Sequence, residues 1–253
     1  MIRIAREPEP AGFASIRDGK LQDARDAIAQ GKRILFKEYD YVKTDLARMQ
    51  YNKCCYCEKL EEQAKYRDVE HYRPKSTYWW LTWTWENLLF ACIDCNREHK
   101  RDQFPLSPGD KALIAELPPP GGEHPLVLDP SDPGIDPTTE ITFRREFIHK
   151  RERWVPRGLT ERGRKTIEVC GLDRPNLLDL YTDHVKHRVR PRLEPLLRAD
   201  HEGHTRVVVE AWNTAKRALL ARSRPFRALS YDALLVIVSP ACRDRYRLTI
   251  DRP

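Results

Sequence analysis

Two Cys-x-x-Cys pairs constrain the fold of this chain more than any other feature. Cys54 and Cys57 form the first pair, and Cys92 and Cys95 form the second. Each pair can place two thiolates on one tetrahedral ion through a tight turn, and two pairs complete a four-sulfur site. A closed site of this kind leaves no position for water, so we expect a structural Zn²⁺ that supplies folding energy. Cys55 is left out, because it could replace Cys54 only in a poorer Cys-x-Cys turn.

The cellular compartment decides whether clustered cysteines bind metal or form disulfides. The opening MIRIAREPEP lacks the apolar segment of a signal peptide, and no apolar run is long enough to span a membrane. We therefore expect a cytoplasmic protein without membrane association, in which clustered cysteines are metal ligands. Cys170 and Cys242 stand alone in apolar surroundings and are predicted to be small buried hydrophobes.

The remaining patterns predict an α+β protein with four regions. These are an N-terminal helical region at 1–50, the cysteine-bearing module at 51–110, a proline-rich connector at 111–145 and a mainly helical C-terminal region at 146–253. Two short strands, PLVLD and EITFRR, are expected in and around the connector. The alternation in WTWEN also fits a strand, whose tryptophans we expect to pack a small core rather than stack on bases.

Helix signals are clearest in the C-terminal region. Thr160 is a candidate N-cap for a helix that runs to Cys170 and stops at Gly171. The next helix is expected to start near Pro175 and to end before Pro191. Two more helices are predicted in HTRVVVEAWNTAKRALLARSRP and PFRALSYDALLVIVSP, and Val42, Leu46 and Met49 mark an apolar helical stripe in the N-terminal region.

The charge of the chain points weakly toward polyanions. The formal net charge is +7, and residues 144–165 hold nine Lys or Arg against three Glu. This basic stretch is either a solvated charged face or a surface that contacts phosphates.

Polar residues within and after the cysteine frame follow an ordered pattern. Glu70 and His71 precede Pro74 in VEHYRP, Asn87 lies in WENLL, and Asn96 follows the last cysteine in CIDCNREHK. This order resembles the HNH nuclease family, whose site is a ββα-metal finger. The resemblance implies a zinc-stabilised ββα-metal HNH finger embedded between mainly helical N- and C-terminal regions.

The resemblance also implies a chemistry, that of a metal-dependent endonuclease hydrolysing nucleic-acid phosphodiester bonds. His71 would be the general base, Glu70 and Asn96 would hold a catalytic Mg²⁺ or Mn²⁺, and Asn87 would position the histidine. Adjacent strand residues point to opposite faces, so Glu70 and His71 must lie at a strand end or bulge to converge. His99 is open between a third metal ligand, a phosphate contact and plain surface.

A looser resemblance covers most of the chain. MIRIAREPEP, the CYCE at 55–58 and RGRKTIEVCGLDRPNLLDLY look like the HNH subunits of Septu-type and retron-associated anti-phage systems. It implies the nuclease effector of a prokaryotic defence complex with an ABC- or SMC-like ATPase partner that docks on the helical C-terminal half. We expect DNA as the substrate, with RNA as the alternative. The rival hypothesis is a non-catalytic zinc module that binds nucleic acid or docks a partner protein.

Overall fold

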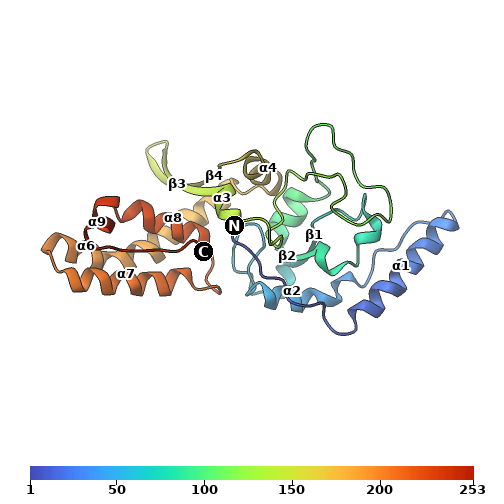
Figure 1. Cartoon of the computed structure of the whole chain (residues 1–253), viewed down its shortest axis with the longest axis horizontal. Coiled ribbons are helices and arrows are strands. Elements are labelled where there is room, and N and C mark those ends of the chain that lie inside the picture. The colour runs from blue at the N-terminus through green and yellow to red at the C-terminus, as the bar shows by residue number, and fades with distance from the viewer. The chain divides into compact units, whose positions relative to one another are not determined.

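The computed structural model describes residues 1–253, which fold into two compact units. The cysteine unit comprises Ile4–Ile135, and the helical unit comprises Met1–Arg3 together with Asp136–Pro253 (Figure 1). Each unit combines helices with one two-stranded antiparallel sheet, which confirms the α+β class. None of the helices has the length and apolar character that crossing a membrane requires.

The cysteine unit is organised around strands β1 (Arg67–His71) and β2 (Leu88–Cys92). Arg67 pairs with Cys92 and His71 with Leu88, so the cysteine and the histidine lie at opposite ends of the sheet. Helix α2 (Lys43–Met49) packs against both strands. The other elements of this unit are α1 (Phe13–Ala29), η1 (Tyr39–Val42), α2 (Lys43–Met49), η2 (Ala64–Tyr66), η3 (Trp79–Leu81), η4 (Trp85–Asn87) and the π-helix η5 (Asp94–Lys100).

The tryptophan-rich segment does not form the expected strand. It folds into the two 3₁₀ turns η3 and η4. Trp83 and Trp85 are nevertheless buried in the main core of the unit, which confirms the core-packing prediction. The Trp83 indole N–H donates to the carbonyl of Lys37 at 2.7 Å, and that of Trp85 donates to Glu7 at 2.8 Å. A buried indole needs such a partner, and these turns supply one for each ring.

The N-terminal prediction is confirmed in part. Val42, Leu46 and Met49 are buried along η1 and α2, as the apolar stripe predicts. The strand predicted at PLVLD is wrong, because residues 101–135 contain no helix or strand beyond an isolated bridge of Leu106 with Pro125. This segment still contributes buried apolar side chains, so its apolar residues reflect packing rather than a strand.

In the helical unit, the predicted strand EITFRR falls on β3 (Ile141–Ile148) except for its first residue, Glu140, but its partner is unexpected. The partner β4 (Arg151–Gly158) comes from the basic stretch, and the two strands form one hairpin. The other elements are α3 (Pro137–Glu140), α4 (Glu161–Cys170), α5 (Pro175–His184), the π-helix η6 (Val185–Val189), α6 (Arg190–Glu202), α7 (Thr205–Leu220), α8 (Arg227–Ile237) and α9 (Pro240–Arg245). Helices α7 and α8 confirm the two predicted segments.

The cap residues of α4 behave as predicted. The Thr160 side chain accepts a hydrogen bond from the Gly163 backbone N–H at 3.1 Å, and Gly171 ends the helix at φ 57°. The expected helix end before Pro191 is wrong, because α5 continues through η6 into α6. Pro191 lies in the first turn of α6, where a proline fits because the π-helical turn has shifted the hydrogen-bond register. Cys170 and Cys242 are buried, as expected.

Candidate functional site

The four predicted metal ligands come together. The Sγ atoms of Cys54, Cys57, Cys92 and Cys95 all lie within 4.8 Å of one another, and all four residues are buried. Cys57 Sγ and Cys92 Sγ are 3.9 Å apart, close to the edge of about 3.8 Å in a tetrahedron with Zn–S bonds of about 2.3 Å. A soft, closed, four-sulfur donor set suits Zn²⁺. Cys55 is buried beside this cluster but is not one of the four.

The cluster is fastened to the sheet by backbone hydrogen bonds. The Glu58 N–H donates to the Cys54 carbonyl at 3.1 Å, which closes the turn that carries the first pair. Cys92 is the last residue of β2, and Cys95 lies in the first turn of η5. Gln50 ties the end of α2 to β2 by donating to the Phe90 carbonyl and accepting from its N–H, both at 2.8 Å. Ligands from distant segments are thus held on one short sheet.

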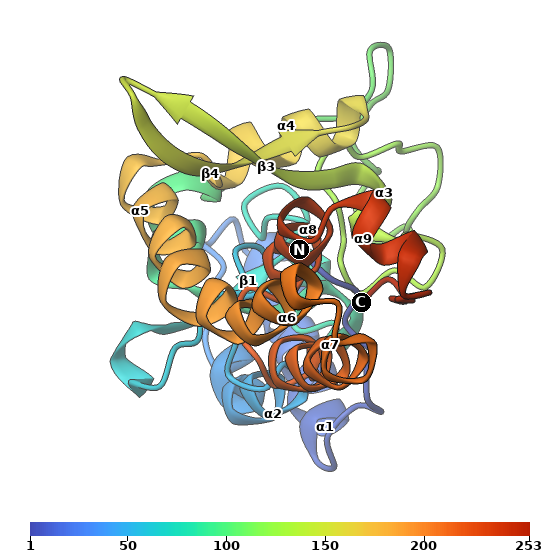
Figure 2. The ribbon, with the colours of Figure 1, turned by 90° about the vertical axis from the view of Figure 1, so that its left-hand side faces the viewer.

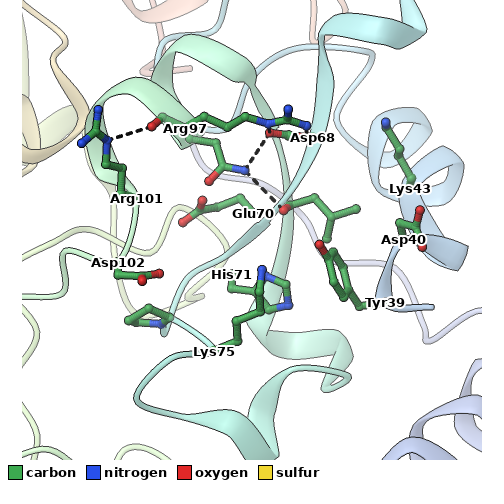
Figure 3. Close-up of a pocket in the computed structure, with 13 residues that line it drawn as sticks. Tyr39, Asp40, Lys43, Asp68, Glu70, His71, Lys75, Arg97, Arg101 and Asp102 are labelled. Carbon is green, nitrogen blue, oxygen red and sulfur yellow. Dashed lines mark hydrogen bonds and ion pairs between the residues drawn. The ribbon is translucent and has the colours of Figure 1, made fainter. Parts of the chain in front are cut away.

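A polar cavity of about 450 Å³ lies along β1, lined by residues of η1, α2, β1, η5 and the segments that follow β1 and η5 (Figure 3). Glu70, His71 and Asn96 all line it, so the structure brings together three of the predicted site residues. Four cationic side chains share the wall with four acidic ones: Lys43, Lys75, Arg97 and Arg101 with Asp40, Asp68, Glu70 and Asp102.

His71 is held as a neutral imidazole with a defined tautomer. The ring Nε2 lies 3.0 Å from the Thr82 carbonyl oxygen, which can only accept, so Nε2 carries the proton and Nδ1 keeps its lone pair. The rings of Tyr39 and His71 pack in a T-shaped arrangement with their centroids 4.8 Å apart. Burial, together with the nearby charge of Lys75, lowers the pKa of His71 to about 3. The imidazole is therefore unprotonated at neutral pH and offers an acceptor.

Glu70 is almost wholly buried, with 1% of its surface exposed, and lies against a buried lysine. Lys100 Nζ is 2.6 Å from Glu70 Oε1 and also donates to the His71 carbonyl at 3.0 Å. The Tyr56 hydroxyl donates to the same Oε1 at 3.1 Å. Burial raises the pKa of Glu70, while Lys100 and Tyr56 act against that rise. The other carboxylate oxygen, Oε2, takes no hydrogen bond or ion pair within the chain.

Glu70 and His71 are neighbours in a strand, so their side chains would normally point to opposite faces, but the strand ends at this pair. His71 is the last residue of β1, and the chain leaves the strand immediately after it. Both Glu70 and His71 are buried, and both line the cavity.

Asn87 does not line the cavity but braces the segment that follows His71. Its Oδ1 accepts from the Arg73 N–H at 2.8 Å, and its Nδ2 donates to the carbonyls of Arg73 and Leu81 at 3.0 and 3.1 Å. The Tyr72 N–H donates to the Asn87 carbonyl at 2.9 Å. These bonds fix both ends of the loop from Arg73 to Leu81, the residue before Thr82, whose carbonyl orients the His71 ring.

Asn96 lies beside the middle of β1. Its Nδ2 donates to Asp68 Oδ2 at 3.1 Å and to the Val69 carbonyl at 3.4 Å, while Oδ1 has no partner within the chain. The Arg97 guanidinium makes a two-pronged contact of 2.6 Å with the Asp68 carboxylate. This pair fixes η5 against β1, so Asn96 has an oxygen available for a cation.

Sequence reasoning missed two residues of the site, Asp68 in the cavity wall and Lys100 behind Glu70. Asp68 precedes Glu70 by two positions on a strand, a spacing that predicts a shared face and could have identified it. Lys100 follows His99 in the sequence motif, but nothing in the sequence marks it as a buried partner of Glu70. His99 does not line the cavity, so the structure gives it no part in this site.

The fold and the site together define a class, an α+β protein with a buried four-cysteine cluster suited to Zn²⁺ beside a polar cavity that contains a neutral histidine. No protein-family model matches the chain, and no solved structure matches it.

Two curated relatives carry one name. The chain is 29% identical over 212 residues to the Septu protein PtuB of Bacillus mycoides (strain KBAB4), a match that covers 71% of this chain and 65% of the relative. It is 38% identical over 97 residues to the Septu protein PtuB of Bacillus thuringiensis, covering 38% of this chain and 36% of that relative. The matches thus span less than two thirds of each relative. They support the resemblance to the Septu-type proteins.

Proposed function

We propose that this protein is a metal-dependent endonuclease of the HNH type that hydrolyses nucleic-acid phosphodiester bonds. The observation that carries the proposal is the state of His71, a buried neutral imidazole whose Nε2–H is occupied by the Thr82 carbonyl. Its Nδ1 is therefore the acceptor, and the residue lines a cavity that also contains Glu70 and Asn96. A fixed acceptor of this kind is what a general base for water requires.

In this proposal, the chain's oxygens hold the catalytic ion. Glu70 Oε2 and Asn96 Oδ1, which have no partners within the chain, are hard donors of the kind that Mg²⁺ and Mn²⁺ prefer. Such an ion, when bound, supplies charge neutralisation on the scissile phosphate. Lys100 keeps Oε1 of the same carboxylate occupied, so it fixes the direction in which Oε2 points. The four cysteines would hold Zn²⁺ away from the chemistry, as a structural ion.

The charge of the substrate would tune the base. Lys75 is one of the causes of the low pKa of His71, and it lines the cavity together with Lys43 and Arg101. A phosphate placed against these cations would offset the charge of Lys75 and raise the pKa of His71 toward the working pH. General-base catalysis is most efficient when the pKa of the base lies near that pH. The base would thus gain strength when substrate is bound.

The biological setting follows from the relatives and is also a proposal. The similarity to Septu proteins PtuB supports a role in prokaryotic anti-phage defence. In this proposal the chain is the nuclease effector, and its partner is an ABC- or SMC-like ATPase. Co-expression of the chain with a candidate ABC- or SMC-like ATPase, followed by size-exclusion chromatography, tests the partnership. Elution of the two proteins as separate species would contradict it.

The enzymatic proposal is tested with supercoiled plasmid and zinc-loaded protein, in Mg²⁺ or Mn²⁺, alone and with the ATPase. We expect nicked or linear product from the wild type and none from His71→Ala. His124→Ala is the matched control, because His124 belongs to the same unit but does not line the cavity. If wild type and His71→Ala give the same product under every condition, His71 is not the base. Salt-sensitive binding without scission by any variant would favour the non-catalytic zinc module.

A further inference from the structure

The β3–β4 hairpin of the helical unit is anchored by packing at its base and by two ion pairs of β4, Glu152 with Arg190 and Arg153 with Asp179. Near its base, Phe143, Trp154 and Val155 are buried, and the strands pack against α4, α5 and α8. The other end, with the turn at 149–150, extends beyond the helices of the unit (Figure 2). Packing within the unit explains the base of the hairpin but not its far end.

The far end exposes apolar side chains and has a strained turn. Phe147 is 69% exposed and Ile148 is 39% exposed. His149 and Lys150, which form the turn, have φ of 49° and 63°, values that hairpin turns usually assign to Asn or Gly. A chain that needed only a tight turn would use those residues. Here the left-handed positions hold His149 and Lys150 instead, which places an ammonium group at the tip.

Four of the six cations of the hairpin have no carboxylate partner. Glu146 pairs with Arg157 and Glu152 with Arg190, so both acidic side chains of the hairpin are already engaged. Arg153 pairs with Asp179 of α5, and no ion pair joins a carboxylate to the other four cations, Arg144, Arg145, Lys150 and Arg151. The strand register places Arg144 and Arg151 on one face and Arg145 on the other. The hairpin therefore presents positive charge from both faces and from its tip.

We propose that this hairpin is an arm that enters the major groove of duplex DNA. The inference rests on the proposed action on nucleic acid and deepens it by naming the form of the substrate. A two-stranded β-ribbon fits the major groove of B-DNA, about 12 Å wide, whereas the major groove of an A-form RNA duplex is too narrow for side chains to read. The cations would contact phosphates on both groove walls, and Phe147, on the same face as Arg145, would contact base edges such as thymine methyl groups.

The arm is tested by fluorescence anisotropy on a labelled DNA duplex and on an RNA duplex of the same sequence. The whole chain carries His71→Ala, is loaded with zinc and receives no other divalent ion, so that binding is measured without cleavage. We expect DNA to bind more tightly than RNA. The triple variant Arg144→Gln, Lys150→Gln, Arg151→Gln should bind DNA at least about tenfold more weakly at 0.1 M salt, with a salt slope lower by about 3.

Matched variants distinguish DNA binding by the hairpin from binding that depends only on the net positive charge of the protein. The double variant Arg206→Gln, Arg217→Gln removes two exposed arginines from α7 and should bind as the parent does. Phe147→Ala should weaken DNA binding while leaving the salt slope unchanged.

The proposal would be overturned if the triple variant and the α7 variant lost DNA affinity equally. Equal affinity of the parent protein for the DNA and RNA duplexes would also overturn it. Undetectable DNA binding would also overturn it and would leave the hairpin as a protein-docking element. Plasmid cleavage by the protein with native His71 is scored separately, so failure of the arm is distinguishable from failure of the nuclease proposal.

Discussion

The buried pair of Lys100 and Glu70 gives the sharpest prediction about the site. Lys100→Met keeps the length and apolar bulk of the side chain but removes the ammonium, which is fully buried and lies 2.6 Å from Glu70 Oε1. The carboxylate, 1% exposed, then loses its counter-charge, and the His71 carbonyl loses its donor. Glu70 should therefore become an uncompensated buried charge in the variant.

The size of the effect follows from the burial of both partners. Removing one member of a buried ion pair costs about 3–5 kcal/mol, because the charge left behind cannot be solvated. Glu70→Gln in the same protein removes that charge while keeping the shape of the side chain. The double variant should therefore recover at least about 2 kcal/mol of the loss, as replacing both charges of a buried pair is often nearly neutral.

The assay is urea unfolding of the wild type, the two single variants and the double variant, at equal zinc content and neutral pH. We expect Lys100→Met to be the least stable of the four proteins. Lys59→Met is a suitable control, because Lys59 is only partly buried. It pairs with Glu61 and Asp94 near the cysteines and does not line the cavity. If the double variant is no more stable than Lys100→Met, the buried charge of Glu70 is not what the lysine neutralises.

Three further predictions concern zinc, pH and Asn87. Cys57→Ser should lose stoichiometric zinc by metal analysis, whereas Cys55→Ser should retain it, since only Cys57 belongs to the cluster; retention by both would refute the assignment. The pKa of His71 is about 3 in the folded protein against about 6.5 unfolded. The contribution of neutral His71 to stability is therefore complete above pH 6.5. Below that, the free energy of unfolding falls by about 1.4 kcal/mol per pH unit as the pH drops toward 3. Urea titrations should show a clearly flatter pH dependence in His71→Asn. Asn87→Ala should lose at least about 2 kcal/mol, because three buried backbone groups lose their partner; an unchanged urea midpoint would refute its bracing role.

The parts of the fold that were predictable are those set by local chemistry. The Cys-x-x-Cys pairs specify a four-thiol cluster because each turn alone positions two ligands. Thr160 and Gly171 predict the ends of α4 because caps act within one turn of a helix. The strand predicted in WTWEN failed because the indole N–H groups find backbone acceptors that are distant in sequence. The helix end predicted before Pro191 failed because the pattern of side chains does not reveal a π-helical turn.

The candidate site, like the fold, was predictable from the sequence only where local patterns determine it. The ordered residues Glu70, His71 and Asn96 could be selected from sequence, and the structure brings them to one cavity. The tautomer of His71 depends on Thr82, and the ionic partner of Glu70 is a lysine far along the chain. Both follow from how η5 and the loop after β1 pack on the sheet, which no local pattern encodes.

The most direct test of the account is chemical rescue of the proposed base. The rate of plasmid cleavage by zinc-loaded His71→Ala in Mg²⁺ or Mn²⁺ is measured with and without free imidazole, at constant ionic strength. We expect the substitution to lower the wild-type rate by about 100-fold or more and imidazole to restore part of the loss, with no effect of imidazole on the wild type. Cleavage by His71→Ala at the wild-type rate, without imidazole, would contradict the central claim that His71 activates the attacking water.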